Sequence, residues 1–101
     1  MPQEQAHMAV RVGVEDQWTL LLQQWSDWDV VTMLRIIDCE SHGDENAVSP
    51  PDYDGLANYG GLQLHGDPEG LNPEYAVEQA HEKFLARGYQ PWIGSAACWR
   101  G

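Results

Sequence analysis

The sequence predicts a small, mainly α-helical domain with one long irregular loop and at most a short β-hairpin. Three observations predict this fold class. A chain of 101 residues supports a single domain with one modest core. Apolar residues recur at helical intervals before residue 42 and again after residue 72, whereas the segment between them is rich in Gly, Pro, Asp and Asn. Five tryptophans, four tyrosines and a hydrophobic content of 43% argue against a disordered chain.

Two helices are expected in the first half of the chain. In the stretch EDQWTLLLQQW, apolar side chains fall at i, i+3, i+4 and i+7, which places them on one helical face: Trp18, Leu21, Leu22 and Trp25. Ser26 is a candidate N-cap of the second helix, with Asp29 three residues later as in a capping box. This helix is expected to run to about Ser41, with its apolar side formed by Trp28, Val31, Leu34 and Ile37.

Residues 42–71 are expected to form irregular chain, with one short hairpin near residues 56–65. An irregular loop of this length inside a compact domain is usually functional. A third helix is expected from Asn72, a plausible N-cap followed by Pro73, to Gly88, a helix-ending residue. Its inner face would carry Val77, Ala80 and Phe84.

The charge of the chain excludes several classes of partner. The net charge is −11, and between Arg35 and Lys83 there is no Lys or Arg, while eleven Asp and Glu occur. This balance argues against binding to nucleic acid, which depends on neutralising phosphates, and against attraction to anionic membrane surfaces. No uncharged apolar run approaches the roughly 18 residues of a membrane span, and no signal peptide is visible. Such acidity is typical of a highly soluble surface, and it also acts on any titrating group within it.

Glu40 lies where the second helix is expected to end, beside Cys39. The helix dipole is negative at that end, and Asp38 and Asp44 lie nearby in sequence. Together with desolvation by the apolar helix face, these features favour a carboxyl group that keeps its proton near neutral pH. A protonated carboxyl group that faces a cleft is the general acid that cleavage of a glycosidic bond requires. Cys39 and Cys98 are the only cysteines, and they are either paired in a disulfide or buried as free thiols.

Three landmarks extend this local argument. They are the pair Glu40–Ser41 in IIDCESHGDENAVSP, the segment NYGGLQL about twenty residues later, and the stretch NPEYAVEQAHEKFLARGYQPW with a closing CW. In this order, over residues 28–99, they resemble the lysozyme-like, soluble lytic transglycosylase superfamily. The resemblance is greatest to the small transglycosylase-like domains related to resuscitation-promoting factors.

The resemblance implies a lysozyme-like domain over residues 15–101. Residues 1–14 show no clean hydrophobic period, so they are expected to form a flexible arm or leader. It implies cleavage of the β-1,4 bond between N-acetylmuramic acid and N-acetylglucosamine in peptidoglycan, with Glu40 as general acid and then base. It also implies a disulfide between Cys39 and Cys98. Ser41 follows the acid as in the family, and Gly60, Gly61 and Gln63 match the segment that lines the glycan cleft. Glycines suit such a position because they let the backbone approach a ligand closely. Three aromatic side chains are candidates for stacking on the sugar, with a place in the core as the other reading of each: Tyr59, Trp92 and Trp99.

Two alternatives stay open at this point. A hydrolase with two carboxylates would need a partner for Glu40 at about 5 Å or more, for which Asp44, Asp52 and Asp54 are available. The segment after Gln63 is shorter than is usual in the family, which keeps a non-catalytic glycan-binding module on the same fold as the second reading.

The expected partner is therefore the glycan strand of peptidoglycan, outside the cytoplasm, and the expected state is a monomer. No cofactor and no metal ion are expected. The two acidic stretches of the loop lack the oxygen spacing of an EF-hand, and the four histidines show no metal-ligand spacing.

Overall fold

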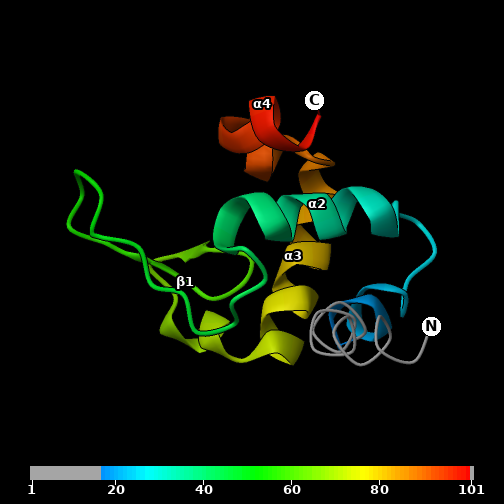
Figure 1. The fold of residues 1–101 in the computed structure, drawn as a ribbon, viewed down its shortest axis with the longest axis horizontal. Coiled ribbons are helices and arrows are strands. Elements are labelled where there is room, and N and C mark those ends of the chain that lie inside the picture. The colour runs from blue at the N-terminus through cyan, green and yellow to red at the C-terminus, as the bar shows by residue number, and fades with distance from the viewer. Residues whose placement is uncertain (1–16, 101) are drawn as a thin grey trace, which may run out of the picture.

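The computed structural model describes residues 17–100, and it confirms a mainly helical domain with a small two-stranded antiparallel sheet (Figure 1). Residues 17–22 are helical. They are followed by α2 (Val30–Ser41), β1 (Asn58–Tyr59), β2 (Leu64–His65), the 3-10 helix η1 (Pro68–Leu71), α3 (Pro73–Arg87), the 3-10 helix η2 (Gln90–Ser95) and α4 (Ala96–Trp99). The N-terminal leader segment expected over residues 1–14 lies outside the described residues.

The start of α2 differs from the prediction. The N-cap is Asp29 and not Ser26: the Asp29 carboxylate accepts hydrogen bonds from the Thr32 backbone N–H at 3.3 Å and from the Thr32 hydroxyl at 2.5 Å. These bonds lower the pKa of Asp29, and the Thr32 hydroxyl contributes most. Asp29 therefore does not act at the third position of a capping box, because it is itself the cap.

The later start of α2 changes which residues face the core. The buried stripe is Met33, Ile36 and Ile37, whereas Val31, expected on the apolar side, is 56% exposed. Trp28 lies before the helix, but it is buried, and its indole N–H donates to the Leu22 carbonyl at 2.8 Å. The prediction placed the right kinds of residue in the core but started the helix three residues too early.

The first helix ends earlier than expected, because residues 23–29 are not helical. Trp18 and Leu22 are buried as predicted. Trp25 lies beyond the helix and stacks on His81 of α3, with ring centroids 4.1 Å apart. This stacking joins the segment after the first helix to α3, so Trp25 contributes to packing although it lies outside the helix.

The bounds and caps of α3 match the prediction closely. The Asn72 side chain accepts from the backbone N–H groups of Glu74 and Tyr75, and Gly88 ends the helix with φ of +61°. Val77 and Ala80 are fully buried.

The expected hairpin is also present, because Asn58 pairs with His65 and Tyr59 with Leu64. Figure 1 shows α2 crossing α3 at a steep angle, with α4 on one side of α2 and the sheet near its C-terminal end. That end of α2 carries Glu40.

Candidate functional site

Glu40 lies in the last turn of α2, and its side chain is half-buried. One carboxylate oxygen, Oε2, accepts a hydrogen bond of 2.5 Å from the Ser95 hydroxyl at the end of η2. Among residues 17–100, Ser95 is the only side chain that donates to this carboxylate. The bond leaves Oε1 available to a ligand. It also fixes the orientation of the carboxyl group through a residue that is distant in sequence.

The residue before Glu40 is covalently anchored. Cys39 forms a disulfide with Cys98 of α4, with the two Cα atoms 6.1 Å apart, so the predicted pairing is confirmed. The disulfide joins α4 to the C-terminal turn of α2, and these two helices also contact each other directly. The backbone of Glu40 is therefore held against the C-terminal segment that supplies Ser95.

The residue after Glu40 is anchored on the opposite side. The Ser41 side chain is buried, and its hydroxyl oxygen lies 3.0 Å from the Ile37 carbonyl and 2.8 Å from the Gly61 carbonyl. The first contact is within α2 and the second reaches the turn between the two strands. The hydroxyl faces the protein interior, so its contacts suit a positioning role better than the sugar contact that the sequence suggested.

Gly60 and Gly61 are required for packing inside the protein. Gly60 has φ of +82°, and a Cβ atom there would collide with the backbone carbonyl oxygen of Gly70. A Cβ atom on Gly61 would collide with the indole ring of Trp18. The family resemblance implies a close approach of the ligand at these two glycines. The structure corrects this reason, because the groups that approach closely are the chain's own backbone and a core tryptophan.

Gln63 and Tyr59 both lie at this turn with half-buried side chains. The Gln63 amide nitrogen donates to the Gly60 carbonyl at 2.9 Å, and it also lies 3.4 Å from the Ala47 carbonyl. Gln63 adopts φ of +51°, which is uncommon for a residue with a side chain. The amide thus braces the turn, and only its oxygen remains for a ligand among the groups of this side chain.

Trp92 and Trp99 were candidates for stacking on sugar rings or for the core, and the structure buries them. They are 4% and 6% exposed, and the indole N–H of Trp99 donates to the Trp92 carbonyl at 3.0 Å. An aromatic ring can stack on a sugar only if one of its faces is accessible. Both residues are therefore corrected from sugar contacts to members of the core.

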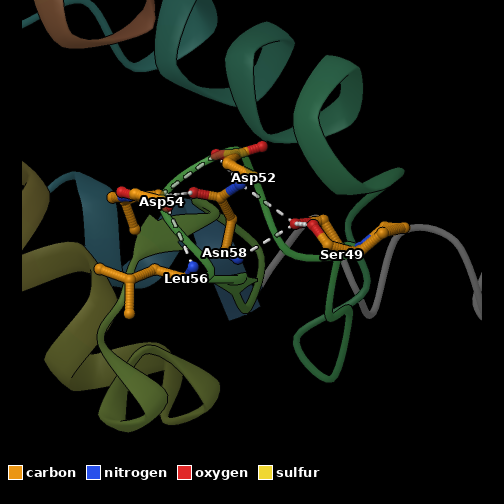
Figure 2. A network of polar contacts seen from close by, with 7 residues as sticks. Ser49, Asp52, Asp54, Leu56 and Asn58 are labelled. Atoms are coloured by element: carbon orange, nitrogen blue, oxygen red, sulfur yellow. Dashed lines mark hydrogen bonds and ion pairs between the residues drawn. The ribbon is translucent and has the colours of Figure 1, made fainter.

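The three candidate partners of Glu40 are exposed, and their carboxylates are engaged locally. Asp44 Oδ1 accepts from the Asn46 backbone N–H at 2.9 Å. Asp52 and Asp54 both contact the imidazole of His65. Figure 2 shows these two carboxylates with Ser49, Leu56 and Asn58. His65 Nε2 lies 2.6 Å from Asp54 Oδ2, and His65 Nδ1 lies 3.3 Å from Asp52 Oδ2. All three carboxylates thus have structural contacts within the loop, and for Asp44 and Asp54 these include the turn hydrogen bonds that Asp commonly makes.

The contact with His65 has an electrostatic consequence for Asp54. Its hydrogen bond to the imidazole, with a further one from the Leu56 backbone N–H, lowers the pKa of Asp54 below its ordinary value. The two ring nitrogens point to different carboxylates and so do not converge with them on one point. Accordingly, no group of three or more His, Cys, Asp or Glu in the described part of the chain is arranged to hold a metal ion.

Sequence reasoning missed Ser95, although a signal for it exists. Ser95 lies three residues before Cys98, and residues three apart lie on the same face of a helical segment. Once Cys98 is paired with Cys39, Ser95 is directed toward the neighbour of Cys39, which is Glu40. The disulfide pairing and the helical spacing together were sufficient to identify this contact.

A separate hollow lies at the junction of η1 and α3. The residues that line it are Pro68, Glu69, Leu71, Asn72, Pro73 and Tyr75. None of the residues expected to bind or cleave a glycan lines this hollow, so it is distinct from the surroundings of Glu40. Beside it, the Tyr75 hydroxyl donates to Asp67 at 2.7 Å, which raises the pKa of Tyr75 to about 12.

Comparison of the chain with protein families, with curated proteins and with solved structures finds no match in any of the three. No helix in residues 17–100 is long and apolar enough to cross a membrane. The function must therefore be argued from the geometry around Glu40.

Proposed function

We propose that this domain cleaves the glycan strand of peptidoglycan, with Glu40 as general acid and base. The observation that carries the proposal is the way Glu40 is held. Cys39 is bonded to α4, Ser41 contacts the turn at Gly61, and Ser95 orients the carboxylate. A catalytic acid must be kept within a narrow range of positions. The contacts of Cys39 and Ser41 restrain the backbone of Glu40 on both sides, and the bond from Ser95 restrains its side chain.

In the proposed reaction, Glu40 donates its proton to the oxygen that bridges N-acetylmuramic acid and N-acetylglucosamine, and the bond from C1 to that oxygen breaks. The resulting carboxylate then takes the proton of the muramyl 6-hydroxyl while O6 bonds to C1. A 1,6-anhydro ring forms, and no water is consumed. Glu40 returns to its protonated form, so a single carboxyl group completes the cycle.

The contacts of the other acids favour this one-acid route over two-carboxylate hydrolysis. Asp52 and Asp54 are directed to His65, and Asp44 caps a turn. Tyr59 and the amide oxygen of Gln63 are the remaining candidates for contacts to the sugar near Glu40, with Ser41 and Ser95 as positioning residues. The disulfide favours an oxidising compartment, so we place the activity outside the cytoplasm.

The test is mass spectrometry of the soluble products released from purified peptidoglycan by the wild type and by Glu40→Gln. Glu78→Gln is the matched control, because Glu78 is an exposed acid on α3. We expect anhydromuropeptides from the wild type and from Glu78→Gln, and none from Glu40→Gln at an unchanged melting temperature.

The other outcomes separate the alternatives. Products that carry an added water would identify a hydrolase and return attention to Asp44, Asp52 and Asp54. Binding to peptidoglycan without any product from the wild type would contradict cleavage and identify a glycan-binding module. Equal product from wild type and Glu40→Gln would remove Glu40 from the reaction.

A further inference from the structure

Residues 49–57 form a projecting loop, here called the arm, between the isolated bridge at Val48 and strand β1. At its tip Tyr53 is fully exposed, with a relative accessibility of 104%. Leu56 on the same arm and Val48 at its base are each about half exposed. An aromatic side chain that contacts nothing in its own protein contributes little to folding, so its exposure calls for another explanation.

The arm is held by a dense set of hydrogen bonds along its length. Its backbone is closed by bonds from Ser49 N–H to the Asn58 carbonyl at 3.0 Å, and from Asp52 N–H to the Leu56 carbonyl at 2.9 Å. The Asn58 amide nitrogen donates to Ser49 Oγ at 3.1 Å and lies 3.4 Å from Asp52 Oδ2 (Figure 2). A loop with this many internal bonds has a defined shape, so Tyr53 is presented in a fixed place.

His65 of β2 adds further contacts between the sheet and the arm. Its Nε2 faces Asp54 Oδ2 at 2.6 Å, and its Nδ1 faces Asn58 Oδ1 at 2.9 Å and Asp52 Oδ2 at 3.3 Å. The orientation of the Asn58 amide is set by its own donations to Ser49 and Asp52. Both ring nitrogens therefore lie within hydrogen-bonding distance of side chains of the arm. His65 thus links Asp52, Asp54 and Asn58.

The position of the arm relates it to the proposed active site. It extends from the sheet past the C-terminal end of α2, which is the end that carries Glu40 (Figure 1). A glycan strand bound at Glu40 is long, and every second ring in it is a neutral N-acetylglucosamine with apolar faces. A tyrosine ring in a surrounding rich in carboxylates suits such a neutral face, whereas an anionic group would be repelled.

We propose that the arm is a second contact for the glycan strand, in which Tyr53 packs on a neutral N-acetylglucosamine ring and His65 is the positioning residue. This inference rests on the proposed function and adds to it a residue that determines how the strand is held. Tyr53 takes no part in bond cleavage, so it affects the binding of long glycans and not the chemical step.

The test uses a β-1,4-linked N-acetylglucosamine tetramer and hexamer as probes and Glu40→Gln as the parent, so that nothing is cleaved. Backbone and aromatic signals are followed by NMR during titration, and dissociation constants are measured at pH 5. With Tyr53→Ala added, we expect the hexamer to bind about five- to tenfold more weakly, since an exposed aromatic anchor contributes on this scale. Tyr53→Phe keeps the ring and should bind within about twofold of the parent. Leu85→Ala removes an exposed apolar side chain of α3 and should have no effect.

The role of His65 is tested by substitution in the same binding experiment. His65→Gln removes the imidazole that contacts Asp52 and Asp54, so the hexamer should bind more weakly, while the Tyr53 ring signals move and the melting temperature stays unchanged. A His65→Gln protein that binds the hexamer as the parent does would contradict the positioning role.

The failure of this inference can be told apart from the failure of the proposed function. If the signals near Glu40 shift while those of the arm do not, and Tyr53→Ala binds as the parent does, the arm serves another partner, such as a protein, and the inference is wrong. If the arm shifts but the wild type releases no product from peptidoglycan, the contact stands and the proposed cleavage is wrong. If neither probe binds, the inference is wrong, and the products released from peptidoglycan still decide the proposed cleavage.

Discussion

Ser95 and Glu40 are 55 residues apart in the chain, yet the Ser95 hydroxyl donates a 2.5 Å hydrogen bond to Glu40 Oε2. The same hydroxyl lies 3.2 Å from the Trp92 carbonyl, so it is held by the backbone of η2. The disulfide one residue before Glu40 brings the two segments together. The carboxylate is thus oriented by a group that the covalent crosslink places beside it.

Replacing Ser95 should therefore affect activity more than stability. Ser95→Ala removes the bond that orients the carboxyl group, and we expect kcat for peptidoglycan cleavage to fall about tenfold or more. Ser95→Thr keeps the hydroxyl and serves as the control, with most of the activity retained. Product release from peptidoglycan and thermal unfolding are measured on the same preparations. A Ser95→Ala protein with wild-type kcat would show that this bond does not position the catalytic group.

Loss of the disulfide should destabilise the domain strongly. Cys39 and Cys98 are separated by 59 residues, and closing a loop of that size stabilises the folded state by about 4 kcal/mol in the chain-entropy account. Urea unfolding of the wild type with and without reductant, compared with Cys39→Ser/Cys98→Ser, measures this difference. The double variant should ignore the reductant. Equal unfolding midpoints for oxidised and reduced wild type would contradict the expected contribution.

The parts of the fold that the sequence predicted well are those with strong local signals. Asn72, Pro73 and Gly88 mark the ends of α3 by chemistry that acts within a few residues, and the structure has the helix within those bounds. The start of α2 was mispredicted because Ser26 and Asp29 are both good caps. The choice between them depends on Trp28, whose side chain is buried and bonded to Leu22, a tertiary contact that local sequence does not reveal.

The candidate site shows the same division. Glu40 at a helix end was identified from its local features, and the disulfide of its neighbour Cys39 from the family resemblance. The roles of Trp92 and Trp99 were not, because a tryptophan in a core and one in a sugar subsite look alike in sequence. Gly60 and Gly61 were singled out correctly as positions that require glycine, but the cause lies in Gly70 and Trp18, which are distant in sequence.

The glycines provide a prediction with a control inside the chain. Gly55 and Gly60 both have φ of +82°, but a Cβ atom on Gly55 would meet nothing within 4 Å, whereas one on Gly60 would collide with the Gly70 backbone. Gly55→Ala should cost only the backbone strain, about 1–2 kcal/mol. Gly60→Ala adds the collision and should cost about 3–5 kcal/mol or prevent folding. Chemical denaturation measures both, and similar losses at the two positions would contradict the close packing of Gly60 on Gly70.

The final prediction concerns the contact between His65 and Asp54. The imidazole is the main cause of the lowered pKa of Asp54, so His65→Ala should raise that pKa toward its ordinary value of 3.8. A carboxyl group with a lowered pKa in the folded state stabilises the protein above its unfolded pKa. This contribution is lost as the pH falls through the folded value, so the arm of the wild type should loosen only below pH 3.8.

Carbon-13 NMR titration of the Asp side-chain carboxyl groups in the wild type and in His65→Ala measures this change directly. Asp29 is the internal control, because its pKa is lowered by Thr32 and should be the same in both proteins. The Leu56 backbone N–H still bonds Asp54 in the variant, so the shift toward 3.8 should be incomplete. An Asp54 titration unchanged by His65→Ala would mean that the imidazole does not hold this carboxylate, which would contradict the role of His65 in fixing the arm.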